Sequence, residues 1–246
     1  MLLAQISDLH LDGTGPTAER SARVVEYLRS LTTQPDAVLV TGDIADHGAP
    51  DEYAEAAALL ATLTPPVFTC PGNHDERTAY RKVLLDEEDA PGAVNRLHHA
   101  AGYAFLMLDS TIPGEDAGLL DDETLDWLTR TLDGLGGTPA VPVLHHPPTP
   151  LHHPYIDTIR LRNAGRLADV LAGRSNIPAV LTGHAHTPAA TAFAGRPLLV
   201  APGVTSTLRL PWEKGETLTS RTPPPGVAFH VLDEDGGITT HFRAVA

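Results

Sequence analysis

Short apolar runs, each closed by polar residues, recur along the chain and set its pattern. Five of them are followed within a few residues by aspartate, asparagine or histidine, and they cover residues 2–6, 37–40, 67–70, 141–144 and 179–182. Runs of four or five apolar residues bounded by polar or turn residues are typical of buried strands. The pattern therefore predicts five core strands whose carboxyl ends carry polar groups into the loops that follow.

Between these runs, apolar residues recur at helical spacing, as Val24, Val25 and Leu28 do. Helices are expected over residues 18–31, 50–62, 78–85, 121–132 and 161–172. Two hairpins are predicted, over residues 96–109 with a turn near Gly102 and over 193–200 with a turn at Gly195. Two closing strands are expected over residues 227–232 and 238–244, on either side of a turn at 233–237.

Strands and helices that alternate in the first half, followed mostly by strands, predict an α/β layered fold. The proline-rich segment 221–225 is interpreted as a rigid connector, because only a hairpin follows it. We therefore expect a single domain over residues 1–246, with the polar strand ends within 8–186 and the C-terminal strands over 193–245.

Composition narrows the classes of function. The formal net charge is −14, which argues against broad binding to a nucleic-acid backbone or to an anionic membrane. The single cysteine, Cys70, excludes an intramolecular disulfide and a multi-cysteine zinc site, and its place in an apolar run predicts a buried packing residue. The first residues lack the pattern of a signal peptide, and no apolar run approaches the roughly 20 residues of a membrane span. A soluble cytoplasmic protein is the expectation.

The side chains at the five strand ends are all metal-capable and contain no sulfur. They are Asp8 and His10, then Asp43, then Asn73 and His74, then His145 and His146, and finally His184 and His186. The carboxyl ends of strands are where α/β folds place their sites. Nitrogen and oxygen ligands suit Mn²⁺, Fe²⁺/Fe³⁺, Zn²⁺ or Co²⁺. The groups are too numerous for one ion but fit two ions that share a carboxylate.

These motifs resemble those of the calcineurin-like metallophosphoesterases over residues 1–205. The resemblance is carried by Asp8-Leu9-His10, Gly42-Asp43, Gly72-Asn73-His74-Asp75, His145 and Gly183-His184-Ala185-His186. It implies a four-layer α-β-β-α sandwich of two mixed sheets flanked by helices. It also implies one metal held by Asp8, His10, Asp43 and His186, and a second held by Asp43, Asn73, His145 and His184.

The resemblance further gives His74 a catalytic role on the leaving-group side of the substrate, while a hydroxide that bridges the two metals attacks phosphorus. Two assignments stay open in the sequence. His146 is the alternative to His145 as a ligand. Asp75 is a catalytic candidate because it could orient His74, but it could equally be a carboxylate at the start of the following helix.

Two differences from the protein serine/threonine phosphatases of the family indicate which branch of the family the chain resembles. His47 and Asp75 stand where those phosphatases carry an arginine and a glutamate. Loss of a guanidinium clamp favours singly charged diesters over monoesters. The chain is similar to bacterial class III cyclic-nucleotide phosphodiesterases and glycerophosphodiesterases, so a small phosphodiester is the expected substrate, with 3′,5′-cyclic AMP first.

The alternatives are a glycerophosphodiester or 2′,3′-cyclic nucleotide, then a small phosphomonoester, then nuclease activity, then a non-catalytic scaffold. A nucleic-acid partner is disfavoured by the charge, and a homo-oligomer is left open. Further polar candidates are His98 and His99 as surface residues, His152 and His153 as part of a substrate mouth, Arg160, Arg162 and Asn163 near that mouth, and Trp212 as a cap on a nucleobase or a packing residue.

Overall fold

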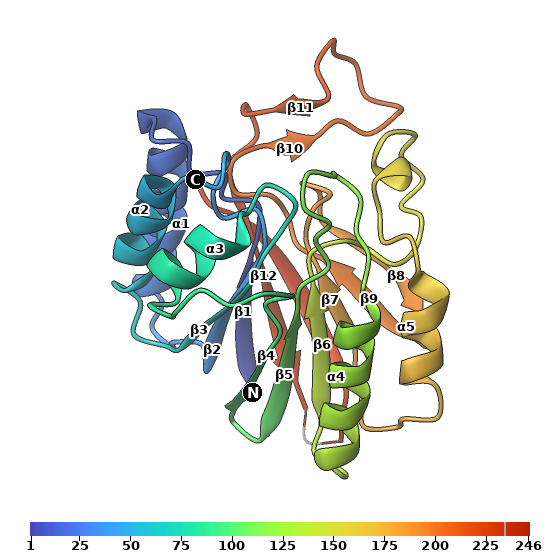
Figure 1. The fold of residues 1–246 in the computed structure, drawn as a ribbon. Coiled ribbons are helices and arrows are strands. Elements are labelled where there is room, and N and C mark those ends of the chain that lie inside the picture. Colours follow the sequence, from blue (N-terminus) through green and yellow to red (C-terminus); the bar gives the residue numbers. More distant parts are fainter. Residues whose placement is uncertain (234) are drawn as a thin grey trace.

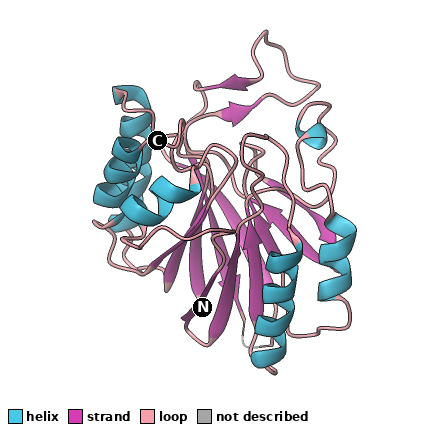
Figure 2. Cartoon of the chain, viewed as in Figure 1, coloured by secondary structure: helices cyan, strands magenta, loops and turns pink. Residues whose placement is uncertain are grey.

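Two β-sheets pack face to face and helices cover their outer faces, as the computed structural model of residues 1–233 and 235–246 shows (Figures 1 and 2). The first sheet has the strand order β13 (Ile238–Ala244), β12 (Gly226–Leu232), β1 (Leu2–Ile6), β2 (Ala37–Thr41) and β3 (Val67–Cys70). The second has the order β4 (Arg96–Ala100), β5 (Tyr103–Leu108), β6 (Ala140–Leu144), β7 (Val180–Thr182), β9 (Arg196–Val200) and β8 (Ala189–Phe193). The α/β fold with two mixed sheets is confirmed.

The helices divide between the two outer faces. Beside the first sheet lie α1 (Gly15–Arg29), α2 (Pro50–Leu60), the short α3 (Arg77–Ala79) and the π-helical η1 (Tyr80–Leu84). Beside the second lie α4 (Asp122–Gly134) and α5 (Ala164–Leu171), and a 3₁₀ turn, η2 (Ile156–Thr158), precedes α5. A small ribbon of β10 (Thr207–Leu208) and β11 (Thr219–Ser220) lies beyond the ends of the sheets (Figure 1).

Apolar side chains on both faces of the strands form three layers. One lies between the two sheets, and one lies beneath the helices on each outer face. Leu3, Leu39 and Phe105 are fully buried in the core between the two sheets. Their neighbours Ala4 and Val38 face the other way, into the core beneath α1 and α2. Successive side chains on a strand point to opposite faces, so a central strand buried on both faces reads as a continuous apolar run.

The strand directions bring polar residues together. β1, β2 and β3 run parallel, and so do β5, β6, β7 and β9. Parallel neighbours end at the same edge of a sheet, and here the two stacked sheets present those ends side by side. Just inside this edge, Gln5 bridges the sheets, because its amide nitrogen donates to the Thr182 carbonyl at 3.0 Å and its oxygen lies 2.9 Å from Nε2 of His230.

The five predicted core strands agree with the structure to within a residue at either end. The buried position of Cys70 and the turn at Gly195, with a φ of 75°, are also confirmed. Glu234, inside the predicted 233–237 turn, lies outside the described residues. The single-domain organisation stays a prediction.

Several elements differ from their predicted bounds: α1 begins at Gly15 rather than at residue 18, and the second hairpin begins at Ala189 rather than at residue 193. The helix expected over 161–172 begins only at Ala164, because the backbone of Leu161 and Arg162 is bonded to Pro147 and Gly118 instead. β10 and β11 were not predicted, since each has only two residues and no periodicity to reveal it. Among the described residues, no helix is long and apolar enough to cross a membrane.

Candidate metal centre

One group of ligand atoms gathers Asp8, His10, Asp43 and His186, all within 4.8 Å of one another. The Nε2 atoms of His10 and His186 lie 3.1 Å apart, and Nε2 of His186 lies 3.5 Å from a carboxylate oxygen of Asp8. Asp8 and His10 follow β1, Asp43 follows β2 and His186 follows β7, and His10 and His186 are 176 positions apart in the chain. This is the set that the family resemblance implies for the first metal.

A second group adjoins the first through Asp43. Oδ2 of Asp43 lies 3.4 Å from Nε2 of His10 and 3.3 Å from Nε2 of His145. Nδ1 of His184 lies 3.1 Å from the same His145 nitrogen. The other carboxylate oxygen, Oδ1, accepts a hydrogen bond from the backbone N–H of His74 at 3.0 Å. One oxygen of Asp43 therefore stands between both groups, which fits a bridging carboxylate.

Several of these atoms are buried without a hydrogen-bond partner among the described residues. They are both carboxylate oxygens of Asp8, Oδ1 of Asn73 and Nε2 of His184. A buried polar atom left unpaired costs roughly 1–3 kcal/mol, so four such atoms gathered at one place call for a partner that satisfies them. All four are lone-pair donors of the kind that first-row metal ions accept. The residues present therefore fit two metal ions.

The ligand side chains pair charged groups among themselves: burial opposes protonation of His145, but the charge of Asp43 outweighs it and raises the pKa of His145 to about 9, so a metal ion bound there would displace that proton. Burial opposes ionisation of Asp43, but the imidazoles of His145 and His10 outweigh it and hold the pKa of Asp43 well below its usual value. Burial lowers the pKa of His184 well below its usual value. A charged carboxylate and a neutral imidazole are the forms that bind a metal.

The two candidate imidazoles after β6 are in different environments. His145 places Nδ1 2.7 Å from the Thr41 carbonyl, which leaves Nε2 directed at Asp43. His146 uses both ring nitrogens, with Nδ1 2.8 Å from Oγ of Ser110 and Nε2 3.1 Å from the Asp116 carbonyl. Nε2 of His145 faces the other predicted ligands Asp43 and His184, which supports His145 as the ligand, although His146 also lies within reach of the cluster.

The backbone at the ligands is strained. Positive φ angles occur at five of the seven predicted metal ligands, which are Asp8 (58°), His10 (43°), Asp43 (49°), His184 (69°) and His186 (50°). Such angles are uncommon outside glycine and cluster at functional sites, where the surrounding structure enforces them. Two backbone hydrogen bonds help to hold these angles here: the N–H of Asp8 donates to the Gly42 carbonyl, and the N–H of His10 donates to the Asp43 carbonyl. Each αL residue turns the chain sharply just after its strand.

The position of Asp75 matches neither of the two roles considered from the sequence, which were to orient His74 and to start the following helix. Its buried carboxylate accepts hydrogen bonds from the backbone N–H groups of Ile44, Ala45 and Gly72 and from the hydroxyl of Tyr53. Burial, with the nearby charge of Asp43, raises the pKa of Asp75 to about 6. The helix that follows is capped by Glu76, whose side chain accepts from the backbone of Thr78 and Ala79. Asp75 thus ties the loop after β2 to the loop after β3.

His74 is oriented by another residue. Its Nδ1 lies 2.7 Å from the backbone carbonyl of Asp46, and its side chain is 40% exposed at the centre's open side. The possibility that Asp75 orients His74 through a direct hydrogen bond finds no support among the described residues, because the Asp75 carboxylate is bonded to the Ile44, Ala45 and Gly72 N–H groups and to the Tyr53 hydroxyl. The proposed catalytic role of His74 does not depend on that contact.

The sequence reasoning missed two residues behind the ligands. Asp46 places Oδ1 2.7 Å from Nδ1 of His10, and this hydrogen bond lowers the pKa of Asp46. Ser206 places Oγ 2.9 Å from Nδ1 of His186. Outer partners of this kind fix the ring and tautomer of a ligating histidine. An aspartate three residues after Asp43 was a visible signal for the first; nothing in the sequence marked Ser206.

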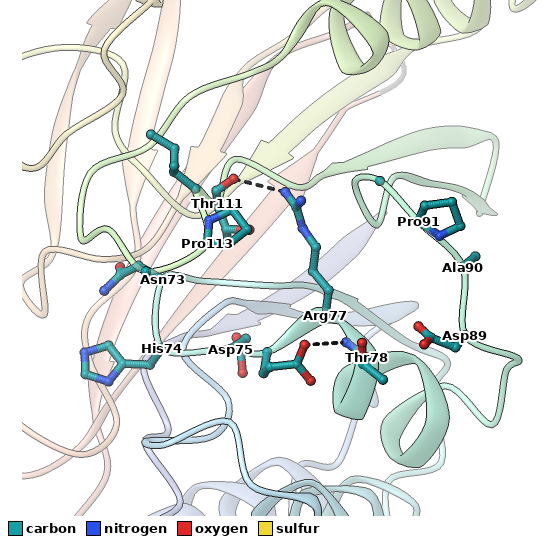
Figure 3. Close-up of a pocket in the computed structure, with 14 residues that line it drawn as sticks. Asn73, His74, Asp75, Arg77, Thr78, Asp89, Ala90, Pro91, Thr111 and Pro113 are labelled. Atoms are coloured by element: carbon teal, nitrogen blue, oxygen red, sulfur yellow. Dashed lines mark hydrogen bonds between the residues drawn. The ribbon is translucent and has the colours of Figure 1, made fainter.

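Two cavities open beside the ligand groups. The first, which we call the catalytic cavity, has a volume of about 350 Å³. It is lined by apolar side chains, by the predicted ligands His10, Asp43, Asn73, His184 and His186, and by the polar residues His74, Asp116 and Thr219. The second, of about 700 Å³, shares Asn73 and His74 with the first and extends along Arg77 and Asp89 (Figure 3). Arg77 lies across it with its guanidinium bonded to the Thr111 carbonyl.

The remaining polar candidates lie apart from the ligands. His98 stacks on Phe68 at a ring distance of 4.3 Å. His153 is buried and accepts hydrogen bonds from the backbone of the following turn, whereas His152 is exposed. Arg162 pairs with Glu115, Asn163 binds the backbone of Leu120, and Trp212 is 75% exposed rather than packed in a core.

Comparison with known proteins identifies the family and agrees with the fold. The model of the calcineurin-like phosphoesterase family matches residues 1–188. The chain therefore belongs to the calcineurin-like phosphoesterase family, and it is an enzyme of the metallophosphoesterase class. The likeness in structure reaches further along the chain: a dimetal phosphatase from Danio rerio superimposes with a TM-score of 0.71 at 15% identity, over 100% of this chain and 99% of that one.

Curated relatives are more similar in sequence. A probable cyclic nucleotide phosphodiesterase of Rhodococcus erythropolis is 36% identical over 223 residues, which cover 87% of this chain and 74% of the relative. The glycerophosphodiester phosphodiesterase GpdQ of Enterobacter lignolyticus is 34% identical over 197 residues, 76% of this chain and 71% of the relative. The 3′,5′-cyclic adenosine monophosphate phosphodiesterase CpdA of Pseudomonas aeruginosa is 33% identical over 193 residues, 76% and 70%.

Proposed function

We propose that the protein hydrolyses a small phosphodiester, with 3′,5′-cyclic AMP as the first candidate. It is a phosphodiesterase of the metallophosphoesterase family, and the similarity to the Rhodococcus and Pseudomonas enzymes supports a cyclic nucleotide as the substrate. A glycerophosphodiester is the second candidate, supported by the similarity to GpdQ.

The observation that carries the preference for a diester is the charge of the catalytic cavity. No arginine or lysine stands among the described residues that line it. A phosphomonoester carries nearly two negative charges, and phosphatases usually hold such a group with a guanidinium fork or an ammonium group. A diester carries one negative charge and needs no such clamp. The exposed His47, paired with the Glu52 carboxylate at 2.7 Å, is not among the lining residues either.

The ligand assignment follows the two groups of side chains. Asp8, His10, Asp43 and His186 would hold one metal ion, and Asp43, Asn73, His145 and His184 the other. Mn²⁺ and iron are the proposed ions, with Zn²⁺ or Co²⁺ as alternatives for this nitrogen and oxygen donor set. When bound, two such ions supply Lewis acidity for the phosphoryl oxygens and a nucleophilic water at neutral pH.

The chain's own contribution to the chemistry centres on His74. Nδ1 of His74 donates to the Asp46 carbonyl, so Nε2 is the nitrogen left for the substrate, and the imidazolium form of His74, with a second proton on Nε2, gives that proton to the departing alkoxide. The backbone N–H of the same residue holds Oδ1 of Asp43. His74 thus couples the leaving-group side to the bridging carboxylate. Asp75 acts as a positioning residue, because it fixes the loops that carry Asp43 and His74.

A hydrolysis panel tests the proposal. Protein loaded with Mn²⁺ is assayed against 3′,5′-cyclic AMP, 2′,3′-cyclic AMP, glycerophosphoethanolamine, simple monoesters and single-stranded DNA, and kcat/KM is compared. We expect a diester to be the best substrate and cyclic AMP to lead the diesters. A monoester with a higher kcat/KM than every diester would overturn the assignment, and a leading glycerophosphodiester would favour the second candidate.

A further inference from the structure

Part of the lining of the catalytic cavity is apolar. Besides the metal-ligating residues, the cavity is lined by five large apolar side chains, which we call the apolar wall: Tyr155, Ile156, Ile159, Leu208 and Leu218. Two short segments supply them, the turn around η2 and the β10–β11 ribbon. Behind the wall, Ile156 and Leu208 pack on Ala185 and Val200 in a small apolar cluster separate from the three main cores.

Two members of the wall are open to solvent. The side chains of Tyr155 and Leu218 are 44% and 43% exposed, and they are among the few large apolar residues left exposed in the described part of the chain. Large apolar surface inside a cavity gains free energy when a ligand covers it, and a tyrosine ring offers a flat face for stacking. The second cavity differs, because Glu76, Arg77 and Asp89 line it.

The wall is tied to the ligands by hydrogen bonds. The backbone N–H of Leu208 donates to the carbonyl of His186 at 3.1 Å, and that of Arg209 donates to the carbonyl of Leu218 at 2.9 Å. Nε2 of His153 lies 3.2 Å from the Arg209 carbonyl and so links the η2 turn to the ribbon. The wall therefore keeps its position relative to the metal centre.

A buried arginine holds the base of the ribbon. The guanidinium of Arg20, on α1, donates to the carbonyls of Val204, Arg221 and Pro223, which stand on both sides of the β10–β11 segment. Three hydrogen bonds to carbonyls far apart in sequence fix where the ribbon leaves and rejoins the sheet. A subsite built on such a segment is preorganised and loses little conformational freedom when a ligand binds.

We propose that the apolar wall is the subsite for the nucleobase of a nucleotide whose phosphate lies at the metal centre, with Tyr155 and Leu218 covering the base. The inference rests on the proposed function and deepens it, because a glycerophosphodiester has no planar apolar group to fill the wall. Stacking of a base on an aromatic side chain strengthens binding by about tenfold to a hundredfold. The wall would therefore select a cyclic nucleotide over a diester of two aliphatic alcohols.

The test compares two ligands that share a phosphorylated ribose but differ in the base. Dissociation constants of adenosine 5′-monophosphate and ribose 5-phosphate are measured by calorimetry on the Mn²⁺-loaded protein. We expect the adenine to tighten binding at least tenfold. Tyr155→Ala and Leu218→Ala should each reduce this advantage, their combination should remove most of it, and Tyr155→Phe should keep it. Binding of ribose 5-phosphate should change less than twofold in all of them.

Trp212→Ala is the control, because this aromatic residue belongs to the same ribbon and is exposed but does not line the cavity. Its affinity for adenosine 5′-monophosphate should equal that of the unaltered protein. Equal affinity for the two ligands, undetectable binding of adenosine 5′-monophosphate at 10 mM or an adenine advantage lost at Trp212 alone would each overturn the subsite. Cyclic AMP turnover is scored separately: an adenine advantage without turnover refutes only the proposed function, and turnover without the advantage refutes only the wall.

Discussion

Oδ1 of Asp46 lies 2.7 Å from Nδ1 of His10, on the side of the imidazole ring away from Asp43 and His186. The carboxylate fixes the proton on Nδ1 and leaves Nε2 for a metal ion. Loss of such an outer partner typically weakens metal binding about 10- to 100-fold. We therefore expect Asp46→Ala to raise the dissociation constant for Mn²⁺ at the first site by that factor, as measured by competition with a chelator.

A surface aspartate provides the matched control. Asp126→Ala removes an exposed carboxylate on α4 and should leave the affinity for Mn²⁺ unchanged. Asp46→Asn keeps an acceptor oxygen for Nδ1 and should lose less affinity than Asp46→Ala. If Asp46→Ala binds Mn²⁺ as tightly as the unaltered protein, the carboxylate has no part in orienting His10.

The two histidines after β6 should behave differently when each is replaced. His145→Ala removes the nitrogen that faces Asp43, so the protein should retain about one metal ion per chain by elemental analysis. His146→Ala should retain two ions but unfold more easily by roughly 1–3 kcal/mol, because Ser110 and the Asp116 carbonyl lose their partner. The reverse pattern of metal loss would assign the ligand to His146.

This pair illustrates what the sequence could and could not predict. The strands and their polar ends were predictable, because an apolar run that stops at aspartate or histidine is a local signal. The choice of His145 over His146 rested on the family resemblance and not on the local pattern, because the environment of His146 depends on Ser110 and Asp116, which approach from a loop about thirty residues earlier in the chain. Contacts of that range follow from the fold and leave no mark on the local pattern.

The same reason explains why the role of Asp75 was missed. Its partners Ile44, Ala45 and Tyr53 belong to segments that meet it only after β2 and β3 have paired. The left-handed backbone at Asp8 and His184 was likewise unpredictable, since no glycine marks these positions. Sequence thus predicted which side chains reach the edge of the sheets, whereas the packing of the loops determines how they are aimed.

Gly72 is the place where this loop packing tolerates least change. A Cβ atom added there would lie 2.2 Å from Oδ1 and 2.4 Å from the backbone nitrogen of Asp43. Gly72→Ala should therefore displace the bridging carboxylate, cost about 1–3 kcal/mol of stability and reduce the metal content. Urea unfolding of chelator-treated protein and elemental analysis measure the two effects.

The control is the same chemical change at an open position. Gly165 lies in α5 with nothing within 4 Å of an added Cβ. Gly165→Ala should stabilise the protein by about 0.5–1 kcal/mol, because alanine loses less backbone entropy in a helix. If Gly72→Ala proves no less stable than Gly165→Ala, the loops around Asp43 accommodate the added Cβ without strain, and the prediction is contradicted.

His74→Ala should separate the proton transfer from metal binding. The variant should retain two metal ions, since its imidazole is outside the predicted ligand set, and kcat for cyclic AMP should fall by about 10²–10⁴-fold. A diester with a 4-nitrophenyl leaving group needs no proton on departure, so its kcat should fall far less. Equal losses for both substrates would assign His74 a role other than proton donation.

His230 should make the stability of the protein depend on pH. It is fully buried between Gln5 and Thr240, and burial lowers its pKa to about 3, whereas an unfolded histidine titrates near 6.5. Between these values the unfolded chain binds a proton that the folded chain does not. The contribution of His230 to the free energy of unfolding is therefore complete above about pH 6.5, and it declines toward pH 3 by about 1.4 kcal/mol per pH unit.

Urea unfolding of chelator-treated protein from pH 7 to pH 4.5 measures how steeply the free energy of unfolding depends on pH. His230→Gln should reduce that slope by the amount expected for one histidine. His241→Gln, at an exposed position on the neighbouring β13, should leave the slope unchanged, and an unaltered slope in His230→Gln would contradict a neutral buried imidazole.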